Sequence, residues 1–328
     1  MNAPKILVTG SSGHLGEALV RVLRQRGQQV AGLDRAPGPF TAIAGDIADR
    51  GVVRNVLARG FTAVVHTATL HKPHVASHPR QAFVDVNVTG TLNLLEESAA
   101  AGVSAFVYTS TTSAFGRALV PAPGEPAAWI TEDVPGVAKN IYGATKTAAE
   151  DLCRVVAGEA GLPVVVLRTS RFFPEGDDDD AARARYPEGN LKANEFLHRR
   201  VDLADVADAH LLAVERAPGI GFGRYIISAT TPFTPDDMRA IRDGAEAVVL
   251  DRYPEVGDEY GRRGWKLLPG IDRVYVNARA RAELGWTPRH DFRAVLDALR
   301  RGEDPRSPLA RAVGAKGYHD RPAGVYTA

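Results

Sequence analysis

The chain has 328 residues, of which 45% are hydrophobic and 24% charged, an ordinary composition for a globular protein with a substantial core. A net charge of +1 excludes strong electrostatic attraction to nucleic acid or an anionic membrane surface. The single cysteine rules out an intramolecular disulfide, and no apolar run approaches the ~20 residues that span a membrane. Because "MNAPKILVTG" passes directly into a strand pattern, we expect no signal peptide. We therefore expect a cytoplasmic protein with no membrane or nucleic-acid partner.

Strand and helix patterns alternate along the first 170 residues. Short apolar runs predict strands at 5–10, 29–34, 41–46, 62–68, 104–110 and 163–169. Helical patterns follow the first strand and recur at 48–59, 79–101 and 141–160. This alternation predicts a doubly wound α/β fold, in which helices cover both faces of a parallel sheet.

The pattern changes after residue 170. Residues 171–190 carry proline, glycine and an acidic run, which predict a long loop. Further along, the sequence predicts a strand at 224–229 and helices at 203–216, 235–244 and 291–301.

A glycine-rich turn follows the first predicted strand. In "TGSSGHLG", residues 9–16, the glycines are Gly10, Gly13 and Gly16, and His14 and Leu15 lie where the next helix begins. Glycines let the backbone approach a pyrophosphate, and a helix N-terminus offers amide donors to it. The position directly after the first strand therefore predicts a dinucleotide site.

Acidic residues end the next two predicted strands. Asp34 lies 18 residues after Gly16, where a carboxylate can accept both hydroxyls of the adenosine ribose and repel a 2′-phosphate. Arg35 follows directly and would tolerate that phosphate, so NAD is favoured and NADP remains the alternative. Asp46 and Ile47, in "GDI", are candidates for contact with the adenine, although Asp46 also suits a helix cap.

Tyr142 and Lys146 lie four positions apart in "NIYGATKTAAED", residues 140–151. In a helix they share one face, at the sheet edge where ligands of such folds bind. A cation about 6 Å from the phenol, at an effective dielectric constant of ~20, favours the phenolate by roughly 2.8 kcal/mol, or about two pK units. The pair therefore predicts a general acid–base, Tyr142, whose pKa Lys146 lowers.

Several motifs occur in an order that resembles the extended short-chain dehydrogenase/reductase family, the NAD-dependent epimerases and dehydratases that include the UDP-glucose 4-epimerases. They are "TGSSGHLG", Asp34, "GDI", "HTA", "VNVTGTLNLLEES", "YTSTTSAFG", "YGATK", "LADVADAH" and "ARAELGWTP". The resemblance implies a dinucleotide-binding Rossmann domain, which we place at 1–170 and 201–231. The smaller substrate lobe is expected at 171–200 and 232–328, and relatives are often dimers, so a homodimer is expected.

The resemblance also implies roles for individual residues. Thr111 would hydrogen-bond the substrate oxygen that Tyr142 protonates or deprotonates, and Lys146 would also hold the nicotinamide ribose. Thr67 and Ala68, in "HTA", match positions on the cofactor side. Asn87 matches a family asparagine there, but a locally satisfied polar residue of the helix is an equal alternative.

The substrate positions depart from the family pattern. Thr111 is followed by Thr112 and Ser113 rather than by carboxylates, which disfavours a dehydratase or a decarboxylase. Family members that bind nucleotide sugars have asparagine where this chain has Arg171, and arginine where it has His198. Arg273 is a candidate substitute for the missing arginines. The candidate substrate contacts are therefore Thr112, His71, Arg171, His198 and Arg273.

Two further clusters do not predict a metal site. Pro73 interrupts the histidines of "HTATLHKPHVASHP", and the run Asp177–Asp180 is typical of a solvated loop. We therefore expect an enzyme that transfers hydride between NAD and a hydroxyl or carbonyl carbon of a sugar or nucleotide sugar. Net oxidoreduction of a smaller alcohol or ketone is the alternative, and a non-catalytic NAD sensor is a third hypothesis.

Overall fold

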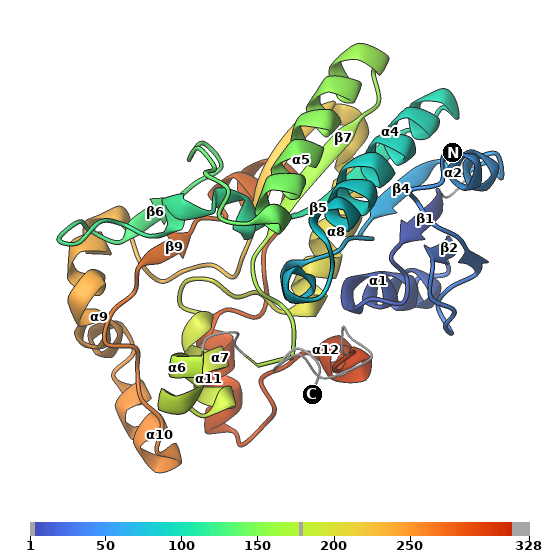
Figure 1. Cartoon of the computed structure of the whole chain (residues 1–328). Coiled ribbons are helices and arrows are strands. Elements are labelled where there is room, and N and C mark those ends of the chain that lie inside the picture. Colours follow the sequence, from blue (N-terminus) through green and yellow to red (C-terminus); the bar gives the residue numbers. More distant parts are fainter. Residues whose placement is uncertain (1–3, 177–179, 317–328) are drawn as a thin grey trace.

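The computed structural model describes residues 4–176 and 180–316 of the chain. Its centre is a seven-stranded sheet in the order β3-β2-β1-β4-β5-β7-β8, and all neighbouring strands are parallel (Figure 1). The strands are β1 (Lys5–Thr9), β2 (Gln29–Asp34), β3 (Ile43–Ala44), β4 (Ala63–His66), β5 (Ala105–Thr111), β7 (Val164–Thr169) and β8 (Phe222–Ile227). This sheet confirms the predicted doubly wound Rossmann fold, whose strand order reverses between β1 and β4.

Helices cover both faces of this sheet. One face packs against α1 (His14–Gln25), α8 (Leu203–Ile220) and α12 (Pro308–Val313). The other packs against α2 (Arg50–Leu57), α4 (Gly90–Ala100) and α5 (Ile141–Ala160), and Figure 1 shows α4 and α5 side by side. All six residues of β7 are buried, because this strand is covered on both sides.

The predicted helix at 79–101 is present but not uniform. It consists of α3 (Arg80–Phe83), a π-helical turn η2 (Val84–Thr89) and α4. Such π-helical turns are rare and occur frequently at functional sites. Here the turn carries Asn87, whose side chain is buried.

A smaller lobe lies beside the sheet, with its own apolar core (Figure 1). Its strands β6 (Ala128–Ile130) and β9 (Arg273–Tyr275) form a parallel pair. Its helices are α6 (Asp180–Arg185), α7 (Glu188–Glu195), α9 (Met238–Arg252), α10 (Glu255–Arg263) and α11 (Phe292–Arg300). The shorter helical turns of the chain are η1 (Lys72–Ala76), η3 (Thr112–Phe115), η4 (Arg117–Leu119), η5 (Pro235–Asp237) and η6 (Ala280–Leu284).

The lobe differs from the sequence expectation in several elements. Residues 171–190, expected as a loop, contain α6 and the start of α7. The helix expected at 235–244 continues to Arg252, past a non-helical kink at Gly244. Neither α10 nor the β6–β9 pair was predicted, because two glycines weaken the helical signal of α10 and each strand has only three residues.

Two segments lie outside the expected division into domains. Strand β6 falls within residues 1–170, yet it pairs with β9 of the lobe. Conversely, α12 falls within 232–328, yet it packs against α1 and α8 of the Rossmann domain. The chain therefore crosses between the two parts more often than the residue ranges predicted.

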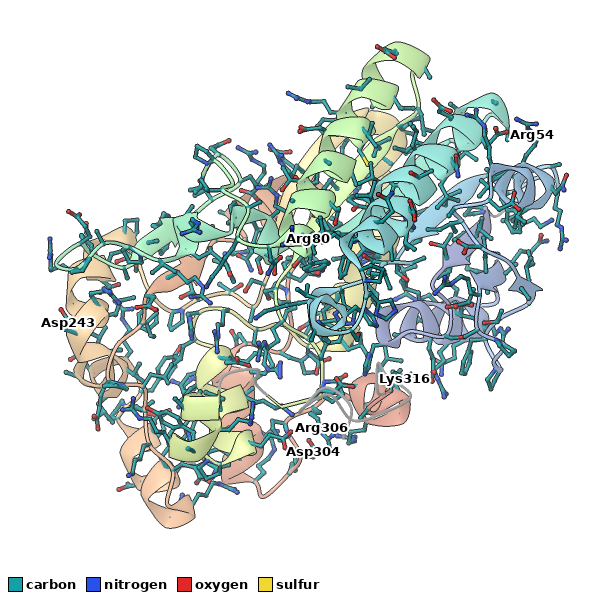
Figure 2. All side chains as sticks on the ribbon, viewed as in Figure 1. Arg54, Arg80, Asp243, Asp304, Arg306 and Lys316 are labelled. Atoms are coloured by element: carbon teal, nitrogen blue, oxygen red, sulfur yellow. The ribbon has the colours of Figure 1, made fainter. Side chains whose placement is uncertain are left out.

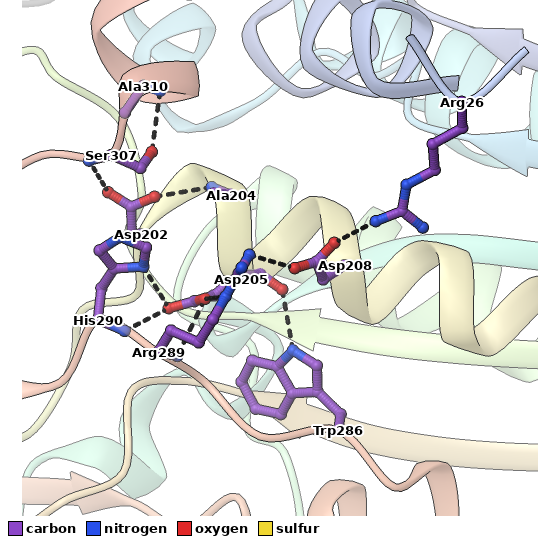
Figure 3. A network of polar contacts seen from close by, with 10 residues as sticks. All are labelled: Arg26, Asp202, Ala204, Asp205, Asp208, Trp286, Arg289, His290, Ser307 and Ala310. Atoms are coloured by element: carbon purple, nitrogen blue, oxygen red, sulfur yellow. Dashed lines mark hydrogen bonds and ion pairs between the residues drawn. The ribbon is translucent and has the colours of Figure 1, made fainter. Parts of the chain in front are cut away.

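Carboxylates of α8 hold the C-terminal part of the chain against the Rossmann domain (Figure 3). Asp205 accepts the backbone N–H groups of Arg289 at 3.0 Å and His290 at 2.9 Å, and its side chain is 1% exposed. Asp208, one turn further on, pairs with Arg26 at 2.9 Å and with Arg289 at 2.5 Å, but it is 29% exposed. Asp202 accepts the N–H of Ser307 at 3.0 Å.

Replacing Asp205 with alanine is expected to lower the free energy of unfolding by about 2–4 kcal/mol, because two backbone N–H groups lose their acceptor in a buried place. Asp208→Ala is the matched control, and we expect it to cost less than about 1 kcal/mol, since its ion pairs are solvated. Urea unfolding followed by circular dichroism measures both values. Equal costs for the two variants would contradict this assignment.

Candidate active site

A cleft of about 1250 Å³ runs along the carboxyl ends of the central strands. Its lining includes Gly10 after β1, Thr67 after β4, Thr111 at the end of β5 and Ser170 after β7. Residues of the lobe, Arg273 and Tyr275, complete the far side. The cleft therefore lies where parallel α/β sheets bind their ligands, at the reversal of strand order.

The glycine-rich turn forms one end of the cleft. Gly10 has a φ of +72°, and a Cβ on Gly16 would lie 1.9 Å from the carbonyl oxygen of Gly10, so the turn and the start of α1 require glycine at both positions. A Cβ on Gly13 would meet only the carbonyl oxygen of Gly10, at 3.3 Å. His14 and Leu15 begin α1 and also line the cleft. These features fit a pyrophosphate at the helix N-terminus.

Asp34 lies at the same end, where β2 finishes. Its two carboxylate oxygens accept the backbone N–H groups of Ser12 and Ala36, each at 2.9 Å, which fixes the side chain beside the turn. Arg35 is 3.5 Å from Asp46, and this exposed pair neutralises the only arginine next to Asp34 in sequence. Asp46 also accepts the N–H of Ala48 at 2.9 Å, but the residue that caps α2 is Asp49, so the capping alternative for Asp46 is wrong. The site therefore fits the hydroxyls of an adenosine ribose better than a 2′-phosphate.

Of the remaining predicted cofactor residues, Thr67, Ala68 and Ile47 line the cleft. Thr67 donates its hydroxyl to the carbonyl oxygen of Thr9 at 2.7 Å, and the N–H of Ala68 donates to the Thr9 hydroxyl at 3.3 Å. These bonds hold the ends of β1 and β4 together. Ile47 is buried and lines the cleft beside Asp46.

Asn87 does not line the cleft within the described residues. Its amide donates to the carbonyl oxygen of Leu70 at 2.8 Å and to the hydroxyl of Thr145 at 3.1 Å. Its oxygen accepts from the N–H of Leu70 at 2.8 Å and from the hydroxyl of Thr69 at 3.0 Å. These bonds use both amide hydrogens and both lone pairs of the amide oxygen, so the structure contradicts direct contact of Asn87 with the cofactor. Asn87 instead positions the loop after β4 against α5.

The first turn of α5 brings a tyrosine close to the end of β5. Asn140 caps this helix by accepting the N–H of Gly143 at 3.0 Å. A Cβ on Gly143 would lie only 2.9 Å from the carbonyl oxygen of Ser113, so glycine permits the close approach. The approach places the Tyr142 phenol in hydrogen-bonding contact with Thr111, and both side chains line the cleft.

Thr111 and Thr112 lie where β5 passes into η3. Thr111 accepts the N–H of Ser113 at 3.1 Å through its hydroxyl oxygen, and it is 9% exposed. Thr112 is buried and also lines the cleft, and its contact with substrate stays a prediction. Lys146 is one helical turn beyond Tyr142, is 2% exposed, and donates to the carbonyl oxygen of Thr109 at 2.6 Å.

The pKa values of Tyr142 and Lys146 differ from the expectation. Burial raises the pKa of Tyr142 to about 12, although the hydrogen bond with Thr111 acts in the opposite direction. Burial lowers the pKa of Lys146 to about 7, partly offset by Glu150. The prediction that Lys146 lowers the phenol pKa is therefore wrong for the protein alone. The ammonium group instead bonds Thr109 and lies 4.1 Å from the centre of the Tyr108 ring.

The opposite end of the cleft is lined by Arg171, Arg199 and Arg273. Glu195 lies 3.6 Å from Arg171, 2.8 Å from Arg199 and 3.2 Å from Arg200, so one carboxylate serves three guanidinium groups. Burial acts to raise the pKa of Glu195, but the arginines outweigh it and hold the value at about 2. Arg273 has no ion pair among the described residues, and its buried Nε has no hydrogen-bond partner there. This end of the cleft is therefore positively charged.

The two predicted histidines have different positions. The ring of His71 lines the cleft, stacks on Phe173 with centroids 5.1 Å apart, and lies 6.4 Å from the ring of Tyr142. His198 does not line the cleft as described, and its Nδ1 bonds the carbonyl oxygen of Arg273 at 3.1 Å. Burial lowers the pKa of His198 well below its ordinary value. The structure therefore contradicts substrate contact by His198, which positions Arg273 instead.

Three cleft residues had no signal in the sequence. Phe173 packs between His14 and His71, and Glu175 lies 2.9 Å from His14. Lys316 reaches the cleft from the C-terminal part of the chain. Burial acts to raise the pKa of Glu175, but its contact with His14 outweighs this and keeps the pKa below the ordinary value. None of these residues belongs to a recognisable local motif, so only the tertiary structure identifies them.

Residues 4–176 and 180–316 contain no cluster of three His, Cys, Asp or Glu side chains arranged to hold a metal ion. Most of the acidic run at 177–180 lies outside the described residues. In the same described ranges, no helix is both long enough and apolar enough to cross a membrane.

The low pKa of Lys146 makes stability depend on pH. Between about pH 7 and 10.5 the unfolded lysine binds a proton that the folded one does not, so the free energy of unfolding rises with pH by up to about 1.4 kcal/mol per unit. We expect Lys146→Met to remove this contribution and to be more stable relative to the natural protein at pH 7 than at pH 9. Urea unfolding at the two pH values measures the difference, and identical pH slopes for both proteins would contradict the prediction.

Comparison with known proteins supports these features. A model of the NAD-dependent epimerase/dehydratase family matches residues 6–224. A UDP-glucose 4-epimerase of Streptomyces lividans is 28% identical over 332 aligned residues, which cover 90% of this chain and 94% of that protein. A 2-alkyl-3-oxoalkanoate reductase of Stenotrophomonas maltophilia is 35% identical over 244 residues, covering 70% of this chain and 71% of that protein.

The fold is also found among solved structures. A short-chain dehydrogenase/reductase superfamily protein from Agrobacterium tumefaciens, solved with bound NAD, has a TM-score of 0.64 and 22% identity. The similarity covers 94% of this chain and 98% of that one. Since the family model spans both the glycine turn and the Tyr142–Lys146 pair, the chain belongs to the NAD-dependent epimerase/dehydratase family.

Proposed function

We propose that this protein is an NAD-dependent enzyme that transfers hydride at a hydroxyl or carbonyl carbon. Its preferred substrate class is a sugar or nucleotide sugar, which it epimerises. The observation that carries the proposal is that Thr111, Tyr142 and Lys146 line the same cleft as the glycine turn and Asp34. When bound, NAD supplies the hydride acceptor and a positively charged nicotinamide ring.

The chain's own residues would move and direct the proton. Tyr142 takes the proton of the substrate hydroxyl during oxidation and returns it to the carbonyl oxygen during reduction. The Thr111 hydroxyl orients that oxygen. With a pKa raised to about 12, the phenol is protonated at neutral pH and ready to act as an acid. Oxidation needs the phenolate, so we infer that the oxidative half-reaction gains rate as the pH rises.

The charge of the substrate end supports an anionic substrate. Arg171, Arg199 and Arg273 line it, and Glu195 is one carboxylate that pairs with the first two. A guanidinium binds phosphate or carboxylate through two parallel hydrogen bonds. A nucleotide diphosphate carries such oxygens, and the relative from Streptomyces lividans is named a UDP-glucose 4-epimerase. The two residues directly after Thr111 are Thr112 and Ser113 rather than carboxylates, so elimination of water lacks its acid and base there.

Net oxidoreduction of a smaller alcohol or ketone is the second candidate. The relative from Stenotrophomonas maltophilia, named a 2-alkyl-3-oxoalkanoate reductase, favours it because a 3-oxo acid also combines a ketone with an anionic group. Both candidates use the same proton chemistry. They differ in whether the oxidised substrate takes back the hydride or leaves the cleft.

Tyr142→Phe removes the proton-transfer group and keeps the ring. We expect kcat to fall by about 10²–10⁴-fold, the usual contribution of a general acid–base. Tyr108→Phe is the matched control, because Tyr108 is a buried tyrosine under Lys146 that does not line the cleft as described. Steady-state assays on both variants test this, and undiminished turnover in Tyr142→Phe would contradict the proton-transfer role of Tyr142.

Nucleotides separate the two candidate functions. In the presence of saturating NAD, we expect UDP, GDP or dTDP at about 100 times its dissociation constant to stabilise the protein by roughly 2.7 kcal/mol, seen as a rise in Tm. Arg273→Gln should lose most of that rise, because it removes a guanidinium that has no ion pair within residues 4–176 and 180–316. A Tm that no nucleotide changes would contradict the nucleotide-sugar proposal and direct the search to alcohols and ketones.

A further inference from the structure

A segment near the C-terminus, residues 307–316 and named here the C-terminal segment, reaches the cofactor end of the cleft. It contains α12 and Lys316, which lines the same cleft as Gly13 and His14. Figure 2 shows Lys316 next to α12 on the side that faces α1. The glycine turn therefore has a neighbour from the other end of the sequence.

Glu175 joins three parts of the protein at this point. Its Oε1 atom is 2.9 Å from Nε2 of His14, at the start of α1, and accepts the backbone N–H of Lys316 at 3.1 Å. The side chains of His14 and Glu175 are each 1% exposed. Lys316 in turn pairs its ammonium group with Glu17, in the first turn of α1. The loop after β7, the glycine turn and the C-terminal segment are thus held together.

The segment is fixed to the Rossmann domain before it reaches the cleft (Figure 3). Asp202, the cap of α8, accepts the N–H of Ser307 at 3.0 Å, and the Ser307 hydroxyl accepts the N–H of Ala310 at 3.0 Å. Val313 is buried in the apolar core that α1 and α8 share. These contacts set the position of Lys316 independently of the lobe.

We propose that the C-terminal segment forms one wall of the cofactor site and slows exchange of the dinucleotide. A dinucleotide with its phosphates at the start of α1, extending from Asp34 to Lys146, would occupy the cleft that Glu175 and Lys316 line. Its release then requires the contacts of Glu175 and Lys316 to break first. The proposal rests on NAD as the cofactor, but not on which substrate is used.

The test is the dissociation rate of NADH from the full-length protein, followed by fluorescence after displacement with excess NAD. We expect Glu175→Ala to raise this rate at least tenfold and Lys316→Gln to raise it at least threefold. Arg306→Gln is the matched control. Arg306 lies just before α12 in sequence and pairs with Asp304 at 2.6 Å (Figure 2). It does not line the cleft as described. Its rate should stay within twofold of the natural protein.

Rates within twofold of the natural value in both cleft variants would overturn the proposal. An increase in Glu175→Ala alone would also overturn it, because the effect would then come from the loop after β7. Lys316→Gln keeps the test valid if Glu175→Ala does not fold. The catalytic proposal fails separately, through undiminished turnover in Tyr142→Phe, whatever the NADH dissociation rates of the two cleft variants are. A protein that binds no NADH in an equilibrium titration would refute the cofactor assignment itself.

Discussion

The close contact between the start of α5 and the end of β5 determines the geometry of the site. Gly143 permits it, since any Cβ there would lie 2.9 Å from the carbonyl oxygen of Ser113. Without that approach, the Tyr142 phenol would not reach Thr111, and Lys146 would not reach the carbonyl oxygen of Thr109. A backbone contact between two elements thus positions three side chains at once, and each of them is held on a rigid helix or strand.

Burial of this contact explains why the pKa values of Tyr142 and Lys146 are shifted. Lys146 lies near Glu150, whose carboxylate is already bound by Arg168 at 2.7 Å and Arg224 at 3.0 Å. Because the two arginines compensate that carboxylate, it offsets the desolvation of Lys146 only in part. The phenol beside it is desolvated too, so the neutral form of each group is favoured. We infer that a bound cofactor, with its own charge, completes the electrostatics of proton transfer.

The sequence predicted what depends on local patterns. Buried strands, the glycine turn, Asp34 and the Tyr142–Lys146 spacing each follow from a repeat or motif of a few residues. It did not predict that the Asn87 amide would donate hydrogen bonds to Leu70 and Thr145, because the position of a residue in a motif does not determine its hydrogen-bond partners. Nor did it predict the raised pKa of Tyr142, since desolvation depends on what packs around a side chain rather than on helical spacing.

The contact of Glu175 with Lys316 bears on how the two candidate functions differ. An epimerase returns the hydride to the same substrate and gains from a cofactor that stays bound through many cycles. A net dehydrogenase must release its cofactor after each turnover, so a slow release step would limit its kcat. Slow cofactor release, as proposed from the contacts of Glu175, therefore suits epimerisation. The cationic far end, with Arg273 unpaired among the described residues, suits either substrate class. Cofactor exchange, rather than the chemistry at Tyr142, is the property that separates them.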